Sequence, residues 1–119
     1  MTSQSFQDLV VWQKAHKFVL NVYRFSSGFP KREIYSLTAQ MRRAAISISA
    51  NISEGFKKEG IRDKARFLNI AQGSLEEVRY YLILVNDLNY GNTGELRNQI
   101  DDVARMLYAY RNTIISKLK

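Results

Sequence analysis

The chain has 119 residues and no cysteine, with 45% hydrophobic residues, 24% charged residues and a formal net charge of +7. This length predicts one domain over residues 1–119 that buries its own core, and the missing cysteine excludes disulfides and thiolate metal sites. The sequence has no apolar run near the roughly 20 residues that span a bilayer and no signal-peptide pattern, so we expect a cytoplasmic protein without a membrane partner. The basic excess indicates either an anionic partner or only a basic, soluble surface.

The first predicted helix covers residues 8–26, where apolar side chains recur at helical spacing. We expect one face of it to enter the core through Leu9, Trp12, Val19, Val22 and Tyr23, beside Val11, Phe18 and Phe25. The second predicted helix covers residues 30–56. We expect it to begin at Pro30, because the fixed φ and missing N–H of proline suit the first helical turn.

The centre of the second helix, AISISANISEGF at residues 45–56, alternates isoleucine with serine in the manner of a half-buried strand. Residues 33–54 contain no glycine or proline, however, so the chain has no place to change from helix to strand. A lone strand among helices would also leave its backbone groups without partners. We therefore predict a helix whose core stripe consists of Leu37, Met41, Ala44, Ala45, Ile48, Ile52 and Phe56.

The third and fourth predicted helices cover residues 62–88 and 93–117, and Asn92 with Glu95 is expected to form a capping box at the start of the fourth. Gly73 is expected to let another backbone or a bulky side chain approach the third helix closely. Four long helices with short connections predict an all-α fold, an antiparallel up-down-up-down four-helix bundle. The two core stripes are Phe67, Leu68, Ala71, Leu75, Val78, Leu82 and Val85, and Leu96, Ile100, Val103, Leu107, Tyr110, Ile114 and Leu118.

The second helix presents more than one packing surface. At about 100° per residue, Ala39, Ile46 and Ala50 lie on a face different from the core stripe. A weakly polar solvent face would explain this pattern, but the large Ile46 side chain favours a second buried face, formed against another subunit. A polar line runs between the two faces, and we interpret it as a hydrogen-bond network or subunit contact, with a ligand-binding cluster as the alternative: Gln40, Arg43, Ser47, Asn51 and Glu54.

Residue patterns for catalysis are sparse. His16 is the single histidine, and no Glu-x-x-His motif of a di-iron site occurs. The sequence has no Gly-rich phosphate loop, zinc pattern or nucleophile elbow. We therefore expect no enzyme activity, no catalytic residue, no metal and no cofactor.

Basic residues gather around the connection between the second and third helices. In an up-down-up-down bundle this connection shares its end with both termini, so Lys117 and Lys119 are expected to join it. Such a cluster is either a solvated loop, as charge runs usually are, or a phosphate-binding surface that an oligomer would repeat. Its members are Lys57, Lys58, Arg62, Lys64 and Arg66, beside Glu59 and Asp63.

Several ordered motifs resemble a bacterial four-helix-bundle family whose members are often encoded within intervening sequences of large-subunit ribosomal RNA genes, with small-subunit ribosomal protein as an older label. The first motif is Phe6-x-Asp8-Leu9 with Val11-Trp12-Gln13-Lys14-Ala15, then Phe29-Pro30. The central motif is Gln40-x-Arg42-Arg43-Ala44 with Ser47-Ile48-x-Ala50-Asn51-Ile52-x-Glu54-Gly55. The third is Phe67-Leu68-x-Ile70-Ala71-x-Gly73-Ser74-x-x-Glu77, so that the resemblance covers residues 6–115.

The resemblance implies an antiparallel four-helix bundle that assembles as a homopentameric ring. A related branch, the accessory proteins of diversity-generating retroelements, is a similar basic pentamer that binds nucleic acid and a reverse transcriptase. The family has no established enzymatic residues to carry over. It often has proline in place of Ser49, so the second helix is expected to run straighter here.

The residues and the resemblance together lead to the hypothesis of a non-enzymatic, ring-forming bundle that binds structured RNA or DNA through a repeated basic surface. The competing hypothesis is a protein–protein adaptor whose ring makes no direct contact with nucleic acid. The candidate phosphate contacts are Arg42, Arg43, Lys57, Lys58, Arg62, Lys64 and Arg66, and the candidate interface or network residues are Ala39, Gln40, Ile46, Ser47, Ala50, Asn51 and Glu54.

Overall fold

Four α-helices make up most of the protein, and the computed structural model describes residues 4–118. Helix α1 spans Val10–Ser26, α2 spans Leu37–Lys57, α3 spans Ile61–Asp87 and α4 spans Gly94–Ser116. Short 3-10 helices at Phe6–Asp8 and Lys31–Glu33 precede α1 and α2. The described residues contain no strand, so the all-α prediction is confirmed, and α2 continues without a break through Ser49.

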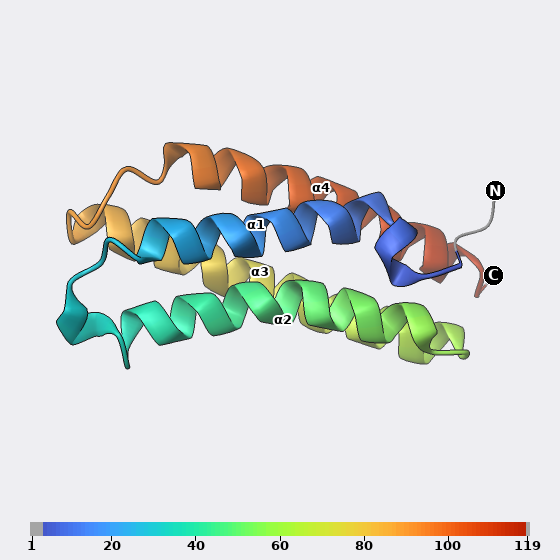
Figure 1. Cartoon of the computed structure of the whole chain (residues 1–119). Helices are drawn as coiled ribbons and strands as arrows, with labels where there is room; N and C mark the ends of the chain where they lie inside the picture. Colours follow the sequence, from blue (N-terminus) through green and yellow to red (C-terminus); the bar gives the residue numbers. More distant parts are fainter. Residues whose placement is uncertain (1–3, 119) are drawn as a thin grey trace.

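The helices pack as the four corners of an elongated bundle of 48 × 23 × 20 Å (Figure 1). Around the bundle, α1 contacts α2, α2 contacts α3, α3 contacts α4 and α4 contacts α1. Each helix runs antiparallel to the one before it, which confirms the up-down-up-down order. One end of the bundle therefore holds the start of α1, the α2–α3 connection and the end of α4.

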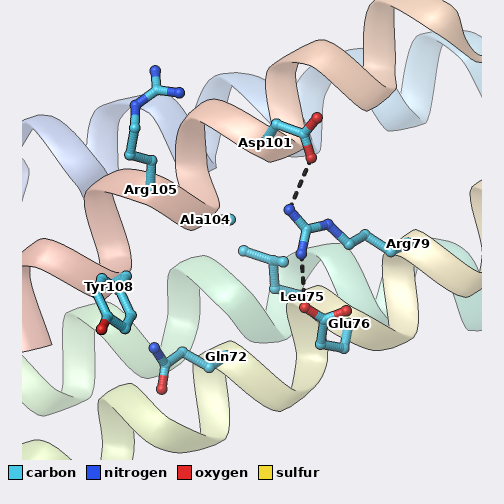
Figure 2. Close-up of a pocket in the computed structure, with 8 residues that line it drawn as sticks. All are labelled: Gln72, Leu75, Glu76, Arg79, Asp101, Ala104, Arg105 and Tyr108. Carbon is cyan, nitrogen blue, oxygen red and sulfur yellow. Dashed lines mark hydrogen bonds and ion pairs between the residues drawn. The ribbon is translucent and has the colours of Figure 1, made fainter.

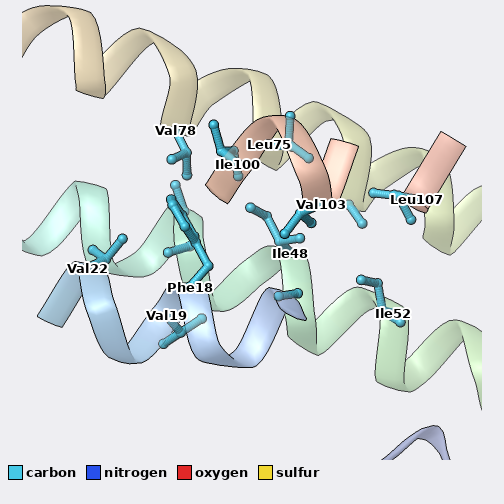
Figure 3. Packing of buried hydrophobic residues seen from close by; sticks show 14 of the residues in the cluster. Phe18, Val19, Val22, Ile48, Ile52, Leu75, Val78, Ile100, Val103 and Leu107 are labelled. Atoms are coloured by element: carbon cyan, nitrogen blue, oxygen red, sulfur yellow. The ribbon is translucent and has the colours of Figure 1, made fainter. Parts of the chain in front are cut away.

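The core is a column of mostly aliphatic side chains to which all four helices contribute (Figure 3). Phe18 of α1, Ile48 of α2, Val78 of α3 and Val103 of α4 are each at most 2% exposed. Each helix buries residues three and four positions apart, which is the spacing that keeps side chains on one helical face. Burying one such side chain contributes about 1.5–3 kcal/mol, so the core stripes of the sequence account for why these segments pack as a bundle.

Two helices begin later than the sequence indicates. Pro30 does not open α2, because it precedes the 3-10 turn, and Ser36 (φ −121°, ψ −103°) leaves the helical conformation before Leu37. The expected start near residue 8 is replaced by another 3-10 turn and an extended Leu9 (φ −75°, ψ 124°). In both places the local signal for a helix start belongs to a short turn, and the long helix starts after it.

The predicted capping box at the start of α4 is wrong. Thr93 occupies the N-cap position and makes no side-chain capping bond. The Asn92 side-chain oxygen instead accepts a hydrogen bond from the Gly94 N–H at 2.9 Å, which closes a local turn. A capping box does occur at the N-terminal 3-10 turn, between Ser5 and Asp8.

The predicted core stripes differ from the structure mainly at their margins. Leu9 and Trp12 are half-buried, and Tyr23 is 41% exposed, so α1 is rotated relative to the expected face. Trp12 stacks on His16, with ring centroids 5.0 Å apart. Among the predicted core residues of the other three stripes, Leu118 is exposed, and Phe56, Phe67 and Tyr110 are half-buried. The buried face of α1 consists of Val11, Ala15, Phe18, Val19, Val22 and Ser26.

Candidate nucleic-acid and subunit interfaces

One end of the bundle holds the predicted basic cluster, and we call this end the basic pole. Lys57 ends α2, Arg62 lies in the first turn of α3, and Lys117 directly follows α4. All three side chains are exposed. The helical topology thus brings the end of α4 to the α2–α3 connection as predicted, while Lys119 lies outside the described residues.

Lys64 is used inside the fold rather than as an open cation of the basic pole. Its Nζ donates hydrogen bonds to the carbonyl oxygens of Gly55 at 3.0 Å and Phe56 at 2.6 Å. These carbonyls lie in the last turn of α2, where helical donors run out, so Lys64 caps that helix. Burial, and then the charge of Lys117, lowers the pKa of the Lys64 ammonium. The cap uses two of the three donors of the ammonium group.

Phe67 positions two further cations of the basic pole. The Lys58 Nζ lies 4.8 Å and the Arg66 guanidinium carbon 4.7 Å from the centroid of its ring. Arg66 also donates to one Asp63 oxygen from Nε at 3.2 Å and from a terminal nitrogen at 2.9 Å. Cation–π contacts at exposed sites contribute about 0.5–1 kcal/mol and restrict the directions of long side chains. The half-buried Phe67 therefore orients Lys58 and Arg66.

Arg111 of α4 belongs to the same end, although we did not predict it from the sequence. Its Nε donates to the carbonyl oxygen of Ala65 in α3 at 3.1 Å. The antiparallel order of α3 and α4 is the signal that could have identified it, because this order places the end of α4 beside the start of α3. A groove of about 440 Å³ lies here, and we call it the arginine groove; its lining residues are Arg62, Ala65, Arg66, Asn69, Arg111, Ile115 and Leu118.

Arg42 and Arg43 lie far from the basic pole, since 14 or 15 residues of helix before Lys57 correspond to about 20 Å along the axis. The Arg42 Nε donates to the Ser26 hydroxyl at 2.8 Å, and its guanidinium lies 4.5 Å from the centroid of the Tyr23 ring. Arg42 therefore joins the end of α1 to α2, whereas Arg43 is exposed. The predicted phosphate contacts thus lie in two separate places. Arg42 and Arg43 lie along the bundle, and the five other predicted cations lie at the basic pole.

The predicted second packing surface, Ala39, Ile46 and Ala50, lies on the outside of α2, and we call it the outer face of α2. Ile46 is 41% exposed, Ala39 and Ala50 are half-buried, and Gln40, Arg43 and Glu54 are exposed. On the neighbouring α3, Gly73 has no atom within 4 Å of the position that a Cβ would take. No other part of the described chain therefore makes the close approach that we predicted at this glycine.

A hydrogen-bond network joins α2 to α3 beside this face. The hydroxyl oxygens of Ser47 and Ser74 are 2.7 Å apart. The Asn51 amide donates to the Ser47 carbonyl oxygen at 2.8 Å and to the Ser47 hydroxyl at 3.0 Å. Asn51 thus uses its amide within the helix, and the network closes inside one chain. Glu54 is exposed and takes no part in it.

A second groove, of about 390 Å³, lies between α3 and α4 (Figure 2). Arg79 lies at one end of the lining, and its terminal nitrogens are 2.7 Å from a Glu76 oxygen and 2.8 Å from an Asp101 oxygen. Exposed pairs of this kind contribute about 0–1 kcal/mol each. These two pairs neutralise the charge of Arg79, and the pair with Asp101 joins α3 to α4.

Residues 4–118 contain neither a candidate metal site nor a candidate membrane-spanning helix. This part of the chain contains no group of three or more His, Cys, Asp or Glu side chains placed to hold a metal ion. None of its helices combines the length and apolar character needed to cross a membrane.

Comparisons with known proteins concern the fold and the family. A crystal structure described as a protein with unknown function from the S23 ribosomal protein family of Bacteroides thetaiotaomicron aligns with a TM-score of 0.76. This alignment has 24% sequence identity and covers 87% of this chain and 96% of that chain, which shows a shared fold. No curated protein matches the sequence. The family model described as 23S rRNA-intervening sequence protein matches residues 7–109, and the chain therefore belongs to that family.

Proposed function

We propose that the protein is a non-enzymatic, ring-forming bundle that binds structured RNA or DNA through its basic pole. The observation behind this proposal is the convergence of cations from the end of α2, the start of α3 and the end of α4. Lys57, Arg62 and Lys117 are exposed there. Clustered cations neutralise backbone phosphates and release counterions, which is a main source of affinity for nucleic acids. We place this binding in the cytoplasm.

The binding is expected to fall steeply with added salt. Fluorescence anisotropy with a structured RNA and a DNA duplex measures the slope of log affinity against log salt concentration. The triple variant Lys57→Gln, Lys58→Gln and Arg62→Gln should bind more weakly, with a slope about two to three smaller in magnitude, because each lost phosphate contact removes about 0.7–0.9.

The matched control removes the same charge at the opposite end of the bundle, by Lys31→Gln, Arg32→Gln and Arg97→Gln, all at exposed positions. It should leave the salt slope of the wild type unchanged. Absence of binding to either nucleic acid at low salt would overturn the proposal.

We also propose that the outer face of α2 forms the contact between copies, with the pentamer as the ring size that the family resemblance implies. Ile46 is 41% exposed between the small residues Ala39 and Ala50, which allow another helix to come close. Ile46→Glu should place a charge in this contact and shift the mass measured by light scattering toward that of a monomer. The control Ile83→Glu changes an isoleucine that is 50% exposed on α3 and should keep the mass. An unchanged mass for Ile46→Glu contradicts this interface.

The alternative function is a protein–protein adaptor without direct nucleic-acid contact. It is favoured by exposed apolar side chains at the end opposite the basic pole, where Ile34 is 51% and Tyr35 93% exposed. Proteins that co-purify with the chain would then survive nuclease treatment and charge reversal of Lys57, Lys58 and Arg62. Under the nucleic-acid proposal, both treatments should release what co-purifies.

A further inference from the structure

The arginine groove differs in the charge of its lining from four other grooves of the described surface. It has a volume of about 440 Å³, against about 390, 310, 210 and 90 Å³ for four others. Each of those four is lined by at least one carboxylate, drawn from Glu76, Glu95, Asp101 and Asp102. The lining of the arginine groove contains three arginines and no carboxylate. The charged side chains that line the groove are therefore all cations, and one of them, Arg66, is paired with Asp63 outside the lining.

The guanidinium groups of the arginine groove keep hydrogen-bond donors for a ligand. Arg111 donates to Ala65 through Nε, which leaves its two terminal nitrogens. Arg66 commits Nε and one terminal nitrogen to Asp63, and Arg62 is exposed. Guanidinium forks match the geometry of phosphate oxygens. Because Arg111 is already held by its Nε bond, ordering it around a phosphate costs less side-chain entropy.

The remaining wall of the groove is mostly apolar. A phosphate group by itself would make no favourable contact with this part of the wall. Ala65 is buried, Ile115 is half-buried and Leu118 is 44% exposed. The backbone of a duplex presents phosphates and sugars to such a surface, because its bases are stacked inside the helix. Single-stranded bases, in contrast, can leave their stack and lie against guanidinium planes or apolar side chains.

We infer that the arginine groove binds one unpaired nucleotide of a single-stranded segment. The phosphate lies on Arg62 and Arg111, and the base lies against Ile115 and Leu118. This inference rests on the proposed function, since it names the part of an RNA or DNA that the basic pole takes. A free nucleotide has the same combination of phosphate and apolar base surface, so the test includes it.

The test measures affinity by fluorescence anisotropy for three labelled probes: an unstructured single-stranded RNA, the same sequence in a duplex, and a nucleoside monophosphate. The single strand should bind roughly fivefold more tightly than the duplex, because its unpaired base buries apolar surface against Ile115 and Leu118. The monophosphate should bind much more weakly than the strand, because it lacks the neighbouring phosphates that reach the rest of the basic pole. Equal affinity for strand and duplex, or equal affinity for strand and monophosphate, would overturn the inference.

Leu118→Ser tests the apolar wall separately from the charges. Leu118 is exposed and follows the end of α4, so the variant should keep the helical circular dichroism of the wild type. We expect its affinity for the single strand to fall about fivefold, because apolar surface that the base buries is lost, and its affinity for the duplex to stay the same. Leu20→Ser, at a leucine 48% exposed on α1, is the matched control.

Unchanged single-strand binding by Leu118→Ser would overturn the assignment of the groove. It would leave the proposed function intact as long as the wild type still binds nucleic acid with a steep salt slope. If the wild-type affinity did not fall steeply with salt, both the proposed function and the assignment of the groove would be overturned.

Discussion

At the scale of single residues, Gly91 lies where the fold leaves no room for a side chain. A Cβ at this position would lie 2.6 Å from the Phe25 ring, which is closer than carbon atoms can approach. Phe25 meets Phe29 edge to face, and Phe29 in turn lies against Tyr90, with 5.7 Å between the ring centroids in each pair. The Phe25 ring therefore has neighbours that resist its movement. Only glycine lets the α3–α4 connection lie this close to α1.

Gly91→Ala should lower the free energy of unfolding by about 1–3 kcal/mol, because the added methyl group forces the aromatic rings or the connection to shift. Urea denaturation followed by circular dichroism measures this change. The variant should still fold, since the connection lies at one end of the bundle.

Gly73→Ala is the matched control for Gly91→Ala, because it adds the same methyl group where no atom lies within 4 Å. Alanine is favoured over glycine in a helix by about 1 kcal/mol, so this variant should be more stable than its parent. Both alanine variants are best compared in a chain that also carries Ile46→Glu. This substitution removes the proposed subunit contact, so that only the stability of the single chain is measured. Equal destabilisation by both alanines would show that the space around Gly91 is not the cause.

At the scale of helices and connections, Glu33 holds two segments together at the end opposite the basic pole. The Tyr90 hydroxyl, from the α3–α4 connection, donates to a Glu33 carboxylate oxygen at 2.7 Å. The Ser36 hydroxyl donates to the other oxygen at 2.6 Å. These bonds, from Ser36 first and Tyr90 second, lower the pKa of Glu33 from its usual 4.5. The ionised carboxylate thus binds the α3–α4 connection to the segment before α2.

Tyr90→Phe should reduce stability at neutral pH and lose this effect in acid. A lowered carboxyl pKa contributes stability that is present above the ordinary pKa and disappears as the pH falls through the folded-state value. The difference in unfolding free energy between the wild type and Tyr90→Phe should therefore be largest at pH 7 and shrink below pH 4.5. Urea denaturation at several pH values measures it.

Tyr35→Phe is the control for this pH dependence, because the Tyr35 side chain is 93% exposed. It should leave stability unchanged at every pH. A pH-independent loss for Tyr90→Phe would mean that the hydroxyl stabilises the fold by some contact other than the Glu33 carboxylate.

At the scale of the whole molecule, the elongated bundle separates the basic pole from the exposed Ile34 and Tyr35 at the other end. The outer face of α2 runs along the length between these ends. Copies joined side by side through this face would present their basic poles together, and several weak phosphate sites would then act as one stronger surface. Assembly and nucleic-acid binding are therefore linked in our proposal.

Assembly should also make thermal stability depend on protein concentration, because association stabilises the folded chain by mass action. The midpoint of thermal unfolding of the wild type should rise as its concentration increases. The Ile46→Glu variant should show a midpoint independent of concentration. A wild-type midpoint that does not change with concentration would contradict a reversible subunit contact.

Much of the fold could be predicted from helical periodicity, because that property depends on residues three and four positions apart. Ile48 and Ile52 lie in the core as expected, even though the serines between them imitate a strand. The sites were less predictable, because Lys64 and Arg111 make their bonds to other helices. The carbonyl that Arg111 contacts lies 46 residues away along the chain.

The sequence by itself determined the family, the four helices and the inward face of most of them, since these follow from local spacing and ordered motifs. Only the tertiary structure decided which cations stay available for a ligand. Lys64 caps α2, Arg42 joins α1 to α2, and Arg111 enters the arginine groove. The physical reason is that a long basic side chain bonds to whatever carbonyl or hydroxyl the packing of helices brings within reach, and no local pattern records that neighbour.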